Sequence, residues 1–246
     1  MTSSPQPALD AGVIATLRKV STATLATQLF RRGFRQQFLV GVNALGPVTE
    51  RVVGEAFTMR FIPSREDIDT LDSLPGKLNL QWQAVEQINA GQVMVVDSMS
   101  SIEAATAGDM LVARAMLRGV AAFITDGAFR DGAEISALPI PTFSRAVTST
   151  TRLSSFHVAD LQVPIGCAGV AVYPGDVIVA DADGVIVIPR HLAEEIAQPA
   201  LEQERLEAYL HTRVHAGEAL WGVYPPNEQT LADYADWTRS NAEVAR

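Results

Sequence analysis

Apolar residues recur at helical spacing near the start of the chain, and this spacing predicts helical packing from Leu9 to Phe30. The positions that carry the pattern are Val13, Leu17, Val20, Leu25 and Leu29. The pattern is interrupted at Ser21-Thr22, and either hydroxyl is suited to cap a second helix. We therefore expect two short helices in this segment, the second ended by Gly33.

Several later stretches have the patterns of strands. Apolar and small or polar residues alternate over 51–62 until Pro63 stops the run, and 92–97 has the continuous apolar core of a buried strand. Two β-branched runs, 177–179 and 185–188, are separated by a turn rich in Asp and ended by Gly, which predicts a hairpin.

Three further segments complete the predicted outline. Residues 80–88 have the pattern of a helix, and the Ser- and Thr-rich segment 144–160 is expected to be a long loop over the sheet. The charged segment 64–77 is expected to be a solvated loop, with a rim that selects the distal part of a substrate as the alternative.

The chain is organised around the stretch from Gly108 to Glu134. Asp109 opens a predicted helix whose apolar face is Leu111, Ala115 and Leu117, with Arg114 and Arg118 toward water and Gly119 as the C-terminal cap. A buried strand over 120–125 follows, and the turn at Asp126-Gly127 then delivers Arg130 and Asp131 side by side. Charged groups thus collect at one edge of a sheet, near a helix N-terminus, where open α/β sheets bind their ligands.

Strands alternate with helices early in the chain and pair as hairpins late, which predicts a mixed sheet in a fold on the border of α/β and α+β. We expect one domain over 1–200 and a C-terminal helical arm over 201–246, packed on that domain or on a neighbouring subunit. The aromatic residues of the arm favour a subunit contact or a covering arm, and a surface appendage is the alternative. These aromatic residues are Trp221, Tyr224, Tyr234 and Trp237.

Composition narrows the class of protein. Hydrophobic residues make up 48% of the chain, enough for a substantial core, and the net charge of -9 argues against a nucleic-acid surface. No secretory signal and no apolar run long enough to span a bilayer, about 20 residues, is evident, so we expect a cytoplasmic protein without a membrane partner. Cys167 cannot form an internal disulfide and is expected to be buried.

The pair Arg130-Asp131 suits metal chemistry on a 2-keto acid. A carboxylate holds Mg²⁺ or Mn²⁺ while water and substrate fill the remaining positions, and the cation stabilises an enolate as a Lewis acid. Arg130 can donate to the keto or enolate oxygen, and the N–H groups at residues 110–112 can bind a carboxylate. The simpler alternatives are a surface ion pair at Arg130-Asp131 and a plain helix N-cap at Asp109.

Two other kinds of catalytic group are less well supported. Lys19 and Lys77 lie in an exposed helix and a turn, so neither resembles the buried lysine of a Schiff-base aldolase. The histidines show no compact metal-ligand spacing, although His157, in the 144–160 segment, is a candidate substrate contact.

Asp109, twenty intervening residues and then Arg130-Asp131 form the D-x20-R-D pattern. With Glu134 and the segment 163–189, this pattern resembles the RraA-like class II pyruvate aldolases, which act on 4-hydroxy-4-methyl-2-oxoglutarate or 4-carboxy-4-hydroxy-2-oxoadipate. The resemblance covers roughly residues 20–200. It implies a swivelling β/β/α sandwich, assembled as a homotrimer or homohexamer, and a small-molecule 2-keto acid as substrate.

The resemblance also implies roles for individual residues. Asp131 is the expected metal ligand, Arg130 the residue that binds substrate and stabilises the enolate, and Asp109 the residue that holds metal-bound water. Substrate is expected at Gly108, Asp109, Met110, Leu111 and Arg130. Glu134, and Glu202 or Glu204 from a neighbouring subunit, are expected to support the metal's waters.

The expected activity is therefore a retro-aldol cleavage that releases pyruvate, with oxaloacetate decarboxylation as a side reaction. The alternative, from the same family resemblance, is a non-catalytic regulator that binds ribonuclease E. That subgroup lacks the acid after the arginine, and the presence of Asp131 favours the enzyme.

Overall fold

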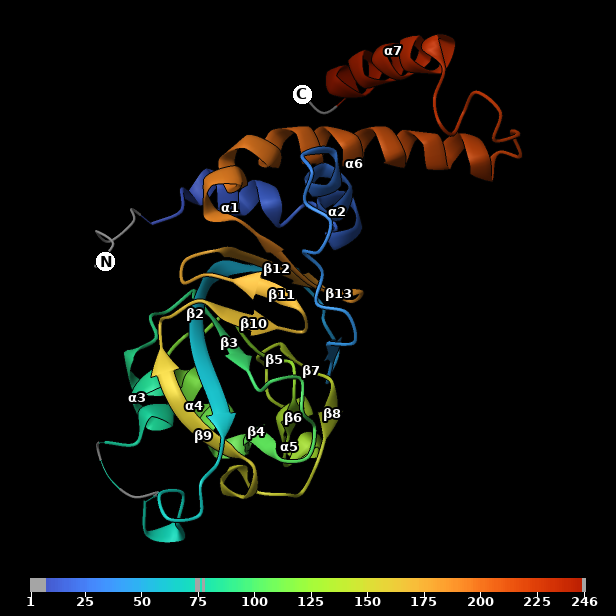
Figure 1. Ribbon diagram of the computed structural model, residues 1–246. Coiled ribbons are helices and arrows are strands. Elements are labelled where there is room, and N and C mark those ends of the chain that lie inside the picture. The colour runs from blue at the N-terminus through green and yellow to red at the C-terminus, as the bar shows by residue number, and fades with distance from the viewer. Residues whose placement is uncertain (1–7, 74–75, 77, 245–246) are drawn as a thin grey trace.

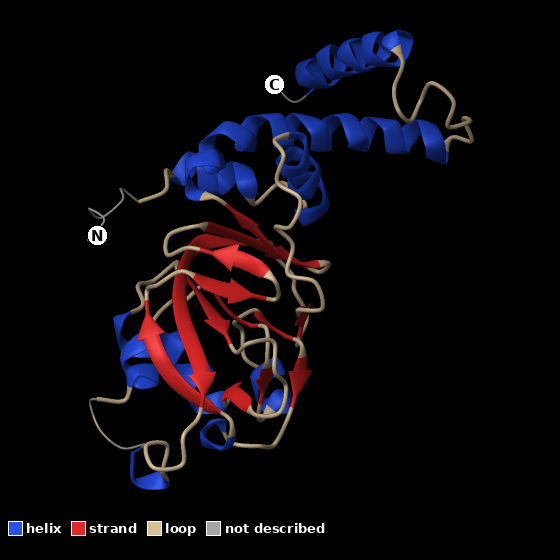
Figure 2. Ribbon diagram, in the orientation of Figure 1, coloured by secondary structure: helices blue, strands red, loops and turns tan. Residues whose placement is uncertain are grey.

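A curved mixed sheet lies at the centre of the computed structural model, which describes residues 8–73, 76 and 78–244 (Figures 1 and 2). Its strands are β1 (Asn43–Ala44), β2 (Val52–Pro63), β3 (Val93–Asp97), β5 (Ala122–Thr125), β7 (Thr142–Ser144), β9 (Phe156–Leu161), β12 (Val177–Asp181) and β13 (Gly184–Ile188). They are ordered β1-β7-β5-β3-β2-β12-β13, with β9 paired to β2. Because β1 also lies against β13, the sheet is nearly closed, as the predicted sandwich requires.

The long strand β2 joins the parts of this sheet. Its first residues pair antiparallel with β12, its middle pairs parallel with β3, and its end pairs antiparallel with β9. The strand is buried along most of its length, which explains the many apolar residues in the predicted strand at 51–62. Pro63 ends it, as expected.

A smaller parallel sheet carries the stretch around Arg130 and Asp131. Its strands are β4 (Ala105–Ala107), β6 (Ala128–Phe129) and β8 (Ala146–Val147), in the order β4-β6-β8. The helix α4 (Asp109–Leu117) follows β4, and α5 (Gly132–Ser136) follows β6. Because β4 and β6 are parallel neighbours, both helices begin at the same edge of this sheet.

The other elements are a hairpin and helices that cover both sides of the sheets. They are α1 (Ala11–Leu17), α2 (Thr22–Arg31), α3 (Leu80–Gln87), α6 (Ala193–His215), α7 (Glu228–Val244), β10 (Ile165–Cys167), β11 (Val170–Val172) and the 3-10 turns η1 (Leu71–Ser73), η2 (Arg152–Ser154) and η3 (Arg190–Leu192). One apolar cluster packs α1, α2 and α6 against the β12–β13 hairpin, and another packs α3 and α4 against the central strands (Figure 1).

Most of the predicted elements are confirmed. The two N-terminal helices are α1 and α2, and Ser21 caps the second by accepting a 3.1 Å hydrogen bond from the Thr24 N–H. Gly33 and Gly119 end their helices with φ of 89° and 80°, values that favour glycine. Cys167 is buried, as expected. Lys19 is exposed, whereas Lys77 lies outside the described residues.

Two expectations are wrong. Segment 144–160 is not a long loop, since it holds β8, η2 and β9, and β9 hydrogen-bonds to the far end of β2. On α4, Leu117 is exposed, because a residue two positions beyond Ala115 lies on roughly the opposite face of the helix. The side chain of Arg118 turns toward the protein, where its guanidinium donates to the Ile88 carbonyl. The residues that α4 buries are Val112 and Ala115.

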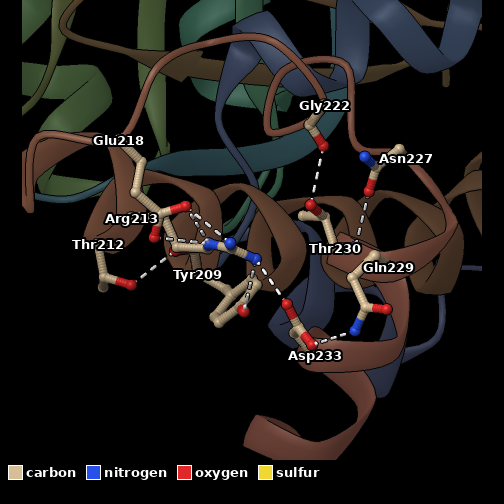
Figure 3. Close-up of polar contacts among 9 residues, drawn as sticks. All are labelled: Tyr209, Thr212, Arg213, Glu218, Gly222, Asn227, Gln229, Thr230 and Asp233. Carbon is tan, nitrogen blue, oxygen red and sulfur yellow. Dashed lines mark hydrogen bonds and ion pairs between the residues drawn. The ribbon is translucent and has the colours of Figure 1, made fainter.

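The C-terminal helices form an arm that extends along and beyond one side of the body (Figure 1). α6 runs without a break across residue 200, and α7 folds back onto its far end through an apolar cluster around Tyr209 and Val223. Arg213 links the two helices to their connection, with ion pairs to Glu218 at 2.7 Å and Asp233 at 2.9 Å (Figure 3). The arm therefore has polar and apolar contacts of its own.

Candidate functional site

Arg130 and Asp131 lie at the end of β6, beside the end of β4. The Arg130 N–H donates to the Ala107 carbonyl at 3.0 Å, which fixes the chain where α4 begins. Asp131 then adopts the left-handed conformation, with φ 56° and ψ 44°, and α5 starts at the next residue. The Arg130 Nε donates to the Asp131 Oδ2 at 3.1 Å, and both side chains are partly exposed.

Gly108 keeps space open against this pair. A Cβ at Gly108 would lie 2.8 Å from the Asp131 Oδ2 and 3.0 Å from the Arg130 Cγ, closer than real Cβ contacts. The backbone of Gly108 is extended, with φ −117°, so its conformation does not demand glycine. The close approach of the Asp131 carboxylate favours glycine, because an added Cβ would have to push that side chain aside, and it shows that the segments before α4 and α5 meet.

The N-terminus of α4 offers unpaired N–H groups at this edge. The first N–H that donates within the helix is that of Val112, to the Gly108 carbonyl at 3.2 Å. The N–H groups of Asp109, Met110 and Leu111 precede this first bond of the helix, and the anion-binding role expected for residues 110–112 stays a prediction. Gly108 caps the helix without a side-chain hydrogen bond, so Asp109 is its first residue and not its N-cap.

The residues present fit an open site for a hard divalent cation. Asp131 offers a carboxylate that is 31% exposed, and glycine opposite it leaves room beside one oxygen. Over the described parts of the chain, no group of three or more His, Cys, Asp or Glu side chains could enclose a metal ion. A cation here would thus depend on water and substrate for most of its ligands, as Mg²⁺ commonly does.

The expected supporting acids lie in different places. Glu134 is exposed in the first turn of α5, three residues after Asp131. Glu202 and Glu204 belong to α6, on the other side of the molecule from α5 (Figure 1). The chain does not bring them to its own Asp131, so the expected contribution from a neighbouring subunit stays a prediction.

Glu202 and Glu204 each have a hydrogen-bond partner within the chain. The Tyr234 hydroxyl donates to Glu202 at 2.7 Å, and the Ser21 N–H donates to Glu204 at 2.8 Å. Burial alone would raise the pKa of Glu204, but hydrogen bonds from Ser21 and Thr24 and the charge of Arg51 outweigh it and lower the pKa. Glu204 is thus held as a carboxylate that docks α6 onto the start of α2.

A polar network at the ends of β3 and β5 was missed from the sequence. Asp126 is fully buried and accepts hydrogen bonds from Ser98, Ser100 and the Ala168 N–H, at 2.7 to 3.0 Å. Nearby, burial raises the pKa of Asp97, against hydrogen bonds from the Met99 and Gly166 N–H groups. An acid that directly follows a buried strand, as both do, was the available signal. The network fixes the connections above the sheet.

His157 lies on β9 and not in a loop. Its Nδ1 is 2.9 Å from the Asp69 Oδ1, in the charged segment that precedes α3. Most of the described part of that segment is exposed, as predicted, but the Asp69 side chain is only 5% exposed.

No helix within the described residues is both long enough and apolar enough to cross a membrane.

Comparison with known proteins gives a consistent family signal. Residues 22–187 match the family model RraA-like, described as Aldolase/RraA. A protein of Halalkalibacterium halodurans, named provisionally as a 4-hydroxy-4-methyl-2-oxoglutarate aldolase, is 34% identical over 164 residues, which are 66% of this chain and 72% of that protein. The 4-hydroxy-4-methyl-2-oxoglutarate aldolase of Thermus thermophilus is 33% identical over 107 residues, which are 44% of this chain and 65% of that protein.

Solved structures have the same fold. The crystal structure of Streptomyces coelicolor RraAS2, described as an unusual member of the RNase ES inhibitor RraA protein family, matches with a TM-score of 0.74 and 32% identity. The match covers 83% of this chain and 98% of that chain. This chain is therefore similar both to proteins named as aldolases and to a member of an inhibitor family.

Proposed function

The chain belongs to the RraA-like family, described as Aldolase/RraA, and from this membership we propose that it is a divalent-metal-dependent lyase. It cleaves a 2-keto acid between carbon atoms and releases pyruvate, in the manner of a 4-hydroxy-4-methyl-2-oxoglutarate aldolase. Oxaloacetate decarboxylation follows as a side activity, because loss of carbon dioxide leaves the same pyruvate enolate.

The observation that carries the proposal is the meeting of Asp131, Arg130 and Gly108 at the start of α4. Asp131 occupies a left-handed conformation that glycine or asparagine would adopt at lower or similar cost, yet the residue is an acid. Its carboxylate faces a glycine that no backbone conformation requires. A simple surface ion pair would need neither feature.

Each residue then has a distinct task. The free N–H groups of Asp109, Met110 and Leu111 bind the carboxylate of the 2-keto acid, assisted by the helix dipole. The Arg130 guanidinium donates to the keto oxygen and stabilises the negative charge that develops there as the carbon–carbon bond breaks. The Asp109 carboxylate, which does not cap its helix, is available to orient water and to accept a proton.

Asp131 would hold the divalent cation, with Glu134 as the nearest further acid on α5. When bound, Mg²⁺ or Mn²⁺ would supply Lewis-acid polarisation of the keto group, typically worth several kcal/mol of transition-state stabilisation. The arm acids Glu202 and Glu204 remain proposed contributors from a neighbouring subunit.

The substitution Asp131→Asn tests this proposal directly. Asparagine tolerates the left-handed conformation, so the fold should persist while the charge that holds the cation is lost. We expect pyruvate release from a panel of 2-keto acids, measured with a coupled lactate dehydrogenase assay, to fall by at least about a hundredfold. Chelation with EDTA should abolish wild-type activity, and added Mg²⁺ or Mn²⁺ should restore it.

Asp160→Asn is the matched control, since Asp160 lies in an exposed ion pair with Arg60 on β9. It should turn over like the wild type. Near-wild-type pyruvate release by Asp131→Asn, or activity indifferent to EDTA, would contradict the proposed role of the metal and of Asp131.

The second candidate function is a non-catalytic regulator of ribonuclease E. The likeness to RraAS2, whose description names an RNase ES inhibitor family, supports it. A pull-down with the purified endonuclease, run beside the pyruvate assay, separates the two. Binding to the endonuclease without any pyruvate release would favour the regulator.

A further inference from the structure

A hollow of about 170 Å³ lies between the charged segment before α3, the turn η2 and the strand β9. It is lined by polar side chains from all three elements, Asp69, Arg152 and His157, and by apolar ones, among them Leu80 and Val158. The volume equals that of roughly five or six liquid water molecules, enough for a small organic acid. Arg130 and Asp131 are not among its lining residues.

Arg152 has fewer partners than its burial calls for. Its side chain is only 12% exposed, its NH1 donates to the Phe156 carbonyl at 2.9 Å, and it stands 4.0 Å from the Asp69 Oδ1. Its Nε is buried without a hydrogen-bond partner among the described residues. A guanidinium carries five N–H donors, and these contacts engage only part of that capacity, so its terminal nitrogens have donors left for a ligand.

His157 has one ring nitrogen engaged by Asp69 and one that is available to a ligand. Its Nδ1 contacts the Asp69 Oδ1 at 2.9 Å, and the other oxygen of Asp69 accepts from the Arg65 N–H at 3.0 Å. The ring is 37% exposed, so its Nε2 is the nitrogen left for a ligand. Asp69, with both oxygens engaged, holds the ring in place.

We propose that this hollow is a small-monoanion site that binds a carboxylate through Arg152 and His157. Arg152 supplies a guanidinium, and His157 supplies the ring nitrogen that Asp69 leaves unengaged. The planar guanidinium fork suits a carboxylate, which can accept two parallel hydrogen bonds. The site is separate from the proposed catalytic site and does not depend on the proposed function.

The charged groups that face the ring are Asp69 from the segment before α3 and Arg152 from η2. The guanidinium of Arg65 is engaged with Asp67 on that same segment. No other charged side chain of the described residues lines the hollow.

The probe is sodium acetate, titrated against sodium chloride at constant ionic strength, with inorganic phosphate as a second arm. The readouts are the ring signals of His157 in two-dimensional NMR and the midpoint of thermal unfolding. We expect acetate to move the His157 signals saturably in the wild type, with at least tenfold weaker binding in Arg152→Gln. In His157→Asn, which has no such signals, we expect acetate to lose its effect on the midpoint of thermal unfolding. Tighter binding of phosphate than of acetate would overturn the carboxylate assignment.

Arg60→Gln is the matched control, because Arg60 lies on the neighbouring strand in an exposed ion pair and should bind acetate like the wild type. Arg130→Gln should also bind normally, which separates this site from the proposed catalytic one. The proposal is overturned if acetate leaves the His157 signals unmoved, or if Arg152→Gln and His157→Asn bind like the wild type.

Discussion

At the scale of single residues, Asp131 is one of several non-glycine residues that the described part of the chain holds at positive φ, and it lies opposite Gly108. A non-glycine residue in the left-handed region costs of the order of 1 kcal/mol, less for aspartate than for most side chains. Strain of this kind persists where surrounding structure fixes it, and here α5 begins immediately after Asp131. We infer that both residues are placed for the chemistry proposed above.

Gly108→Ala is the sharpest test of that inference. The added Cβ would lie 2.8 Å from the Asp131 Oδ2, so the carboxylate must move while the extended backbone accepts alanine without strain. We expect kcat/KM for pyruvate release to fall roughly tenfold to a hundredfold, because small displacements of positioned groups are costly. The thermal midpoint should change little.

Gly166→Ala is the control for this substitution. A Cβ there meets nothing within 4 Å, and the residue does not need a positive φ. Equal activity losses in both variants, or an unchanged kcat/KM in Gly108→Ala, would count against a crowded catalytic arrangement around Asp131.

At the scale of elements, the sequence predicted what periodicity alone can determine. The strands at 51–62, 92–97 and 177–188 carry patterns that a buried sheet imposes, and they are β2, β3 and the β12–β13 hairpin. β9 was missed because its stabilising partner, the end of β2, is about a hundred residues away in the chain. His157 keeps the alternation between Phe156 and Val158, but Asp160 breaks it two residues later.

The candidate site, like the fold, was predictable from the sequence only in part. The spacing of Asp109, Arg130 and Asp131 pointed to one sheet edge, and the parallel pairing of β4 with β6 puts the ends of their strands there. The left-handed Asp131, the space at Gly108 and the hydrogen bond that occupies Val112 depend on three-dimensional contacts. No local pattern in the sequence encodes those contacts.

The junction of α6 and α7 allows a prediction about one element. Arg213 bonds to Glu218 in the connection and to Asp233 on α7, beside Tyr209 on its own helix (Figure 3). We expect Arg213→Gln to release α7 from α6 and to speed hydrogen exchange over 217–244. The thermal midpoint of the sheet domain should stay within a few degrees, because α7 does not pack against the sheets (Figure 1).

Arg239→Gln is a matched control on α7 itself, since Arg239 lies in an exposed i,i+3 ion pair with Asp236 of the same helix. This variant should show the same hydrogen-exchange rates over 217–244 as the wild type. Unchanged protection of α7 in Arg213→Gln would show that the apolar cluster around Tyr209 and Val223 holds the arm without the ion pairs.

At the scale of the whole molecule, large apolar side chains remain exposed at several places, and two of these places bear on assembly. Met110 and Val147 are 79% and 52% exposed near the start of α4 and the end of β8, and Trp221 is 92% exposed on the arm. Exposed large apolar side chains favour burial against another chain. In such an assembly, the arm of one subunit could cover the exposed apolar surface of its neighbour.

The exposed residues favour assembly, and the family resemblance implies its number, so we expect a homotrimer or homohexamer. Light scattering after size exclusion should give three or six times the 26.4 kDa chain mass. Met110→Lys places a charge that is costly to bury in the expected interface, so it should shift the assembly toward monomer. Leu71→Lys, on η1 and 74% exposed, is the control and should assemble normally. A monomeric wild type at tens of micromolar would remove the basis for an arm acid that reaches a neighbouring Asp131, and with it the proposed part of Glu202 and Glu204.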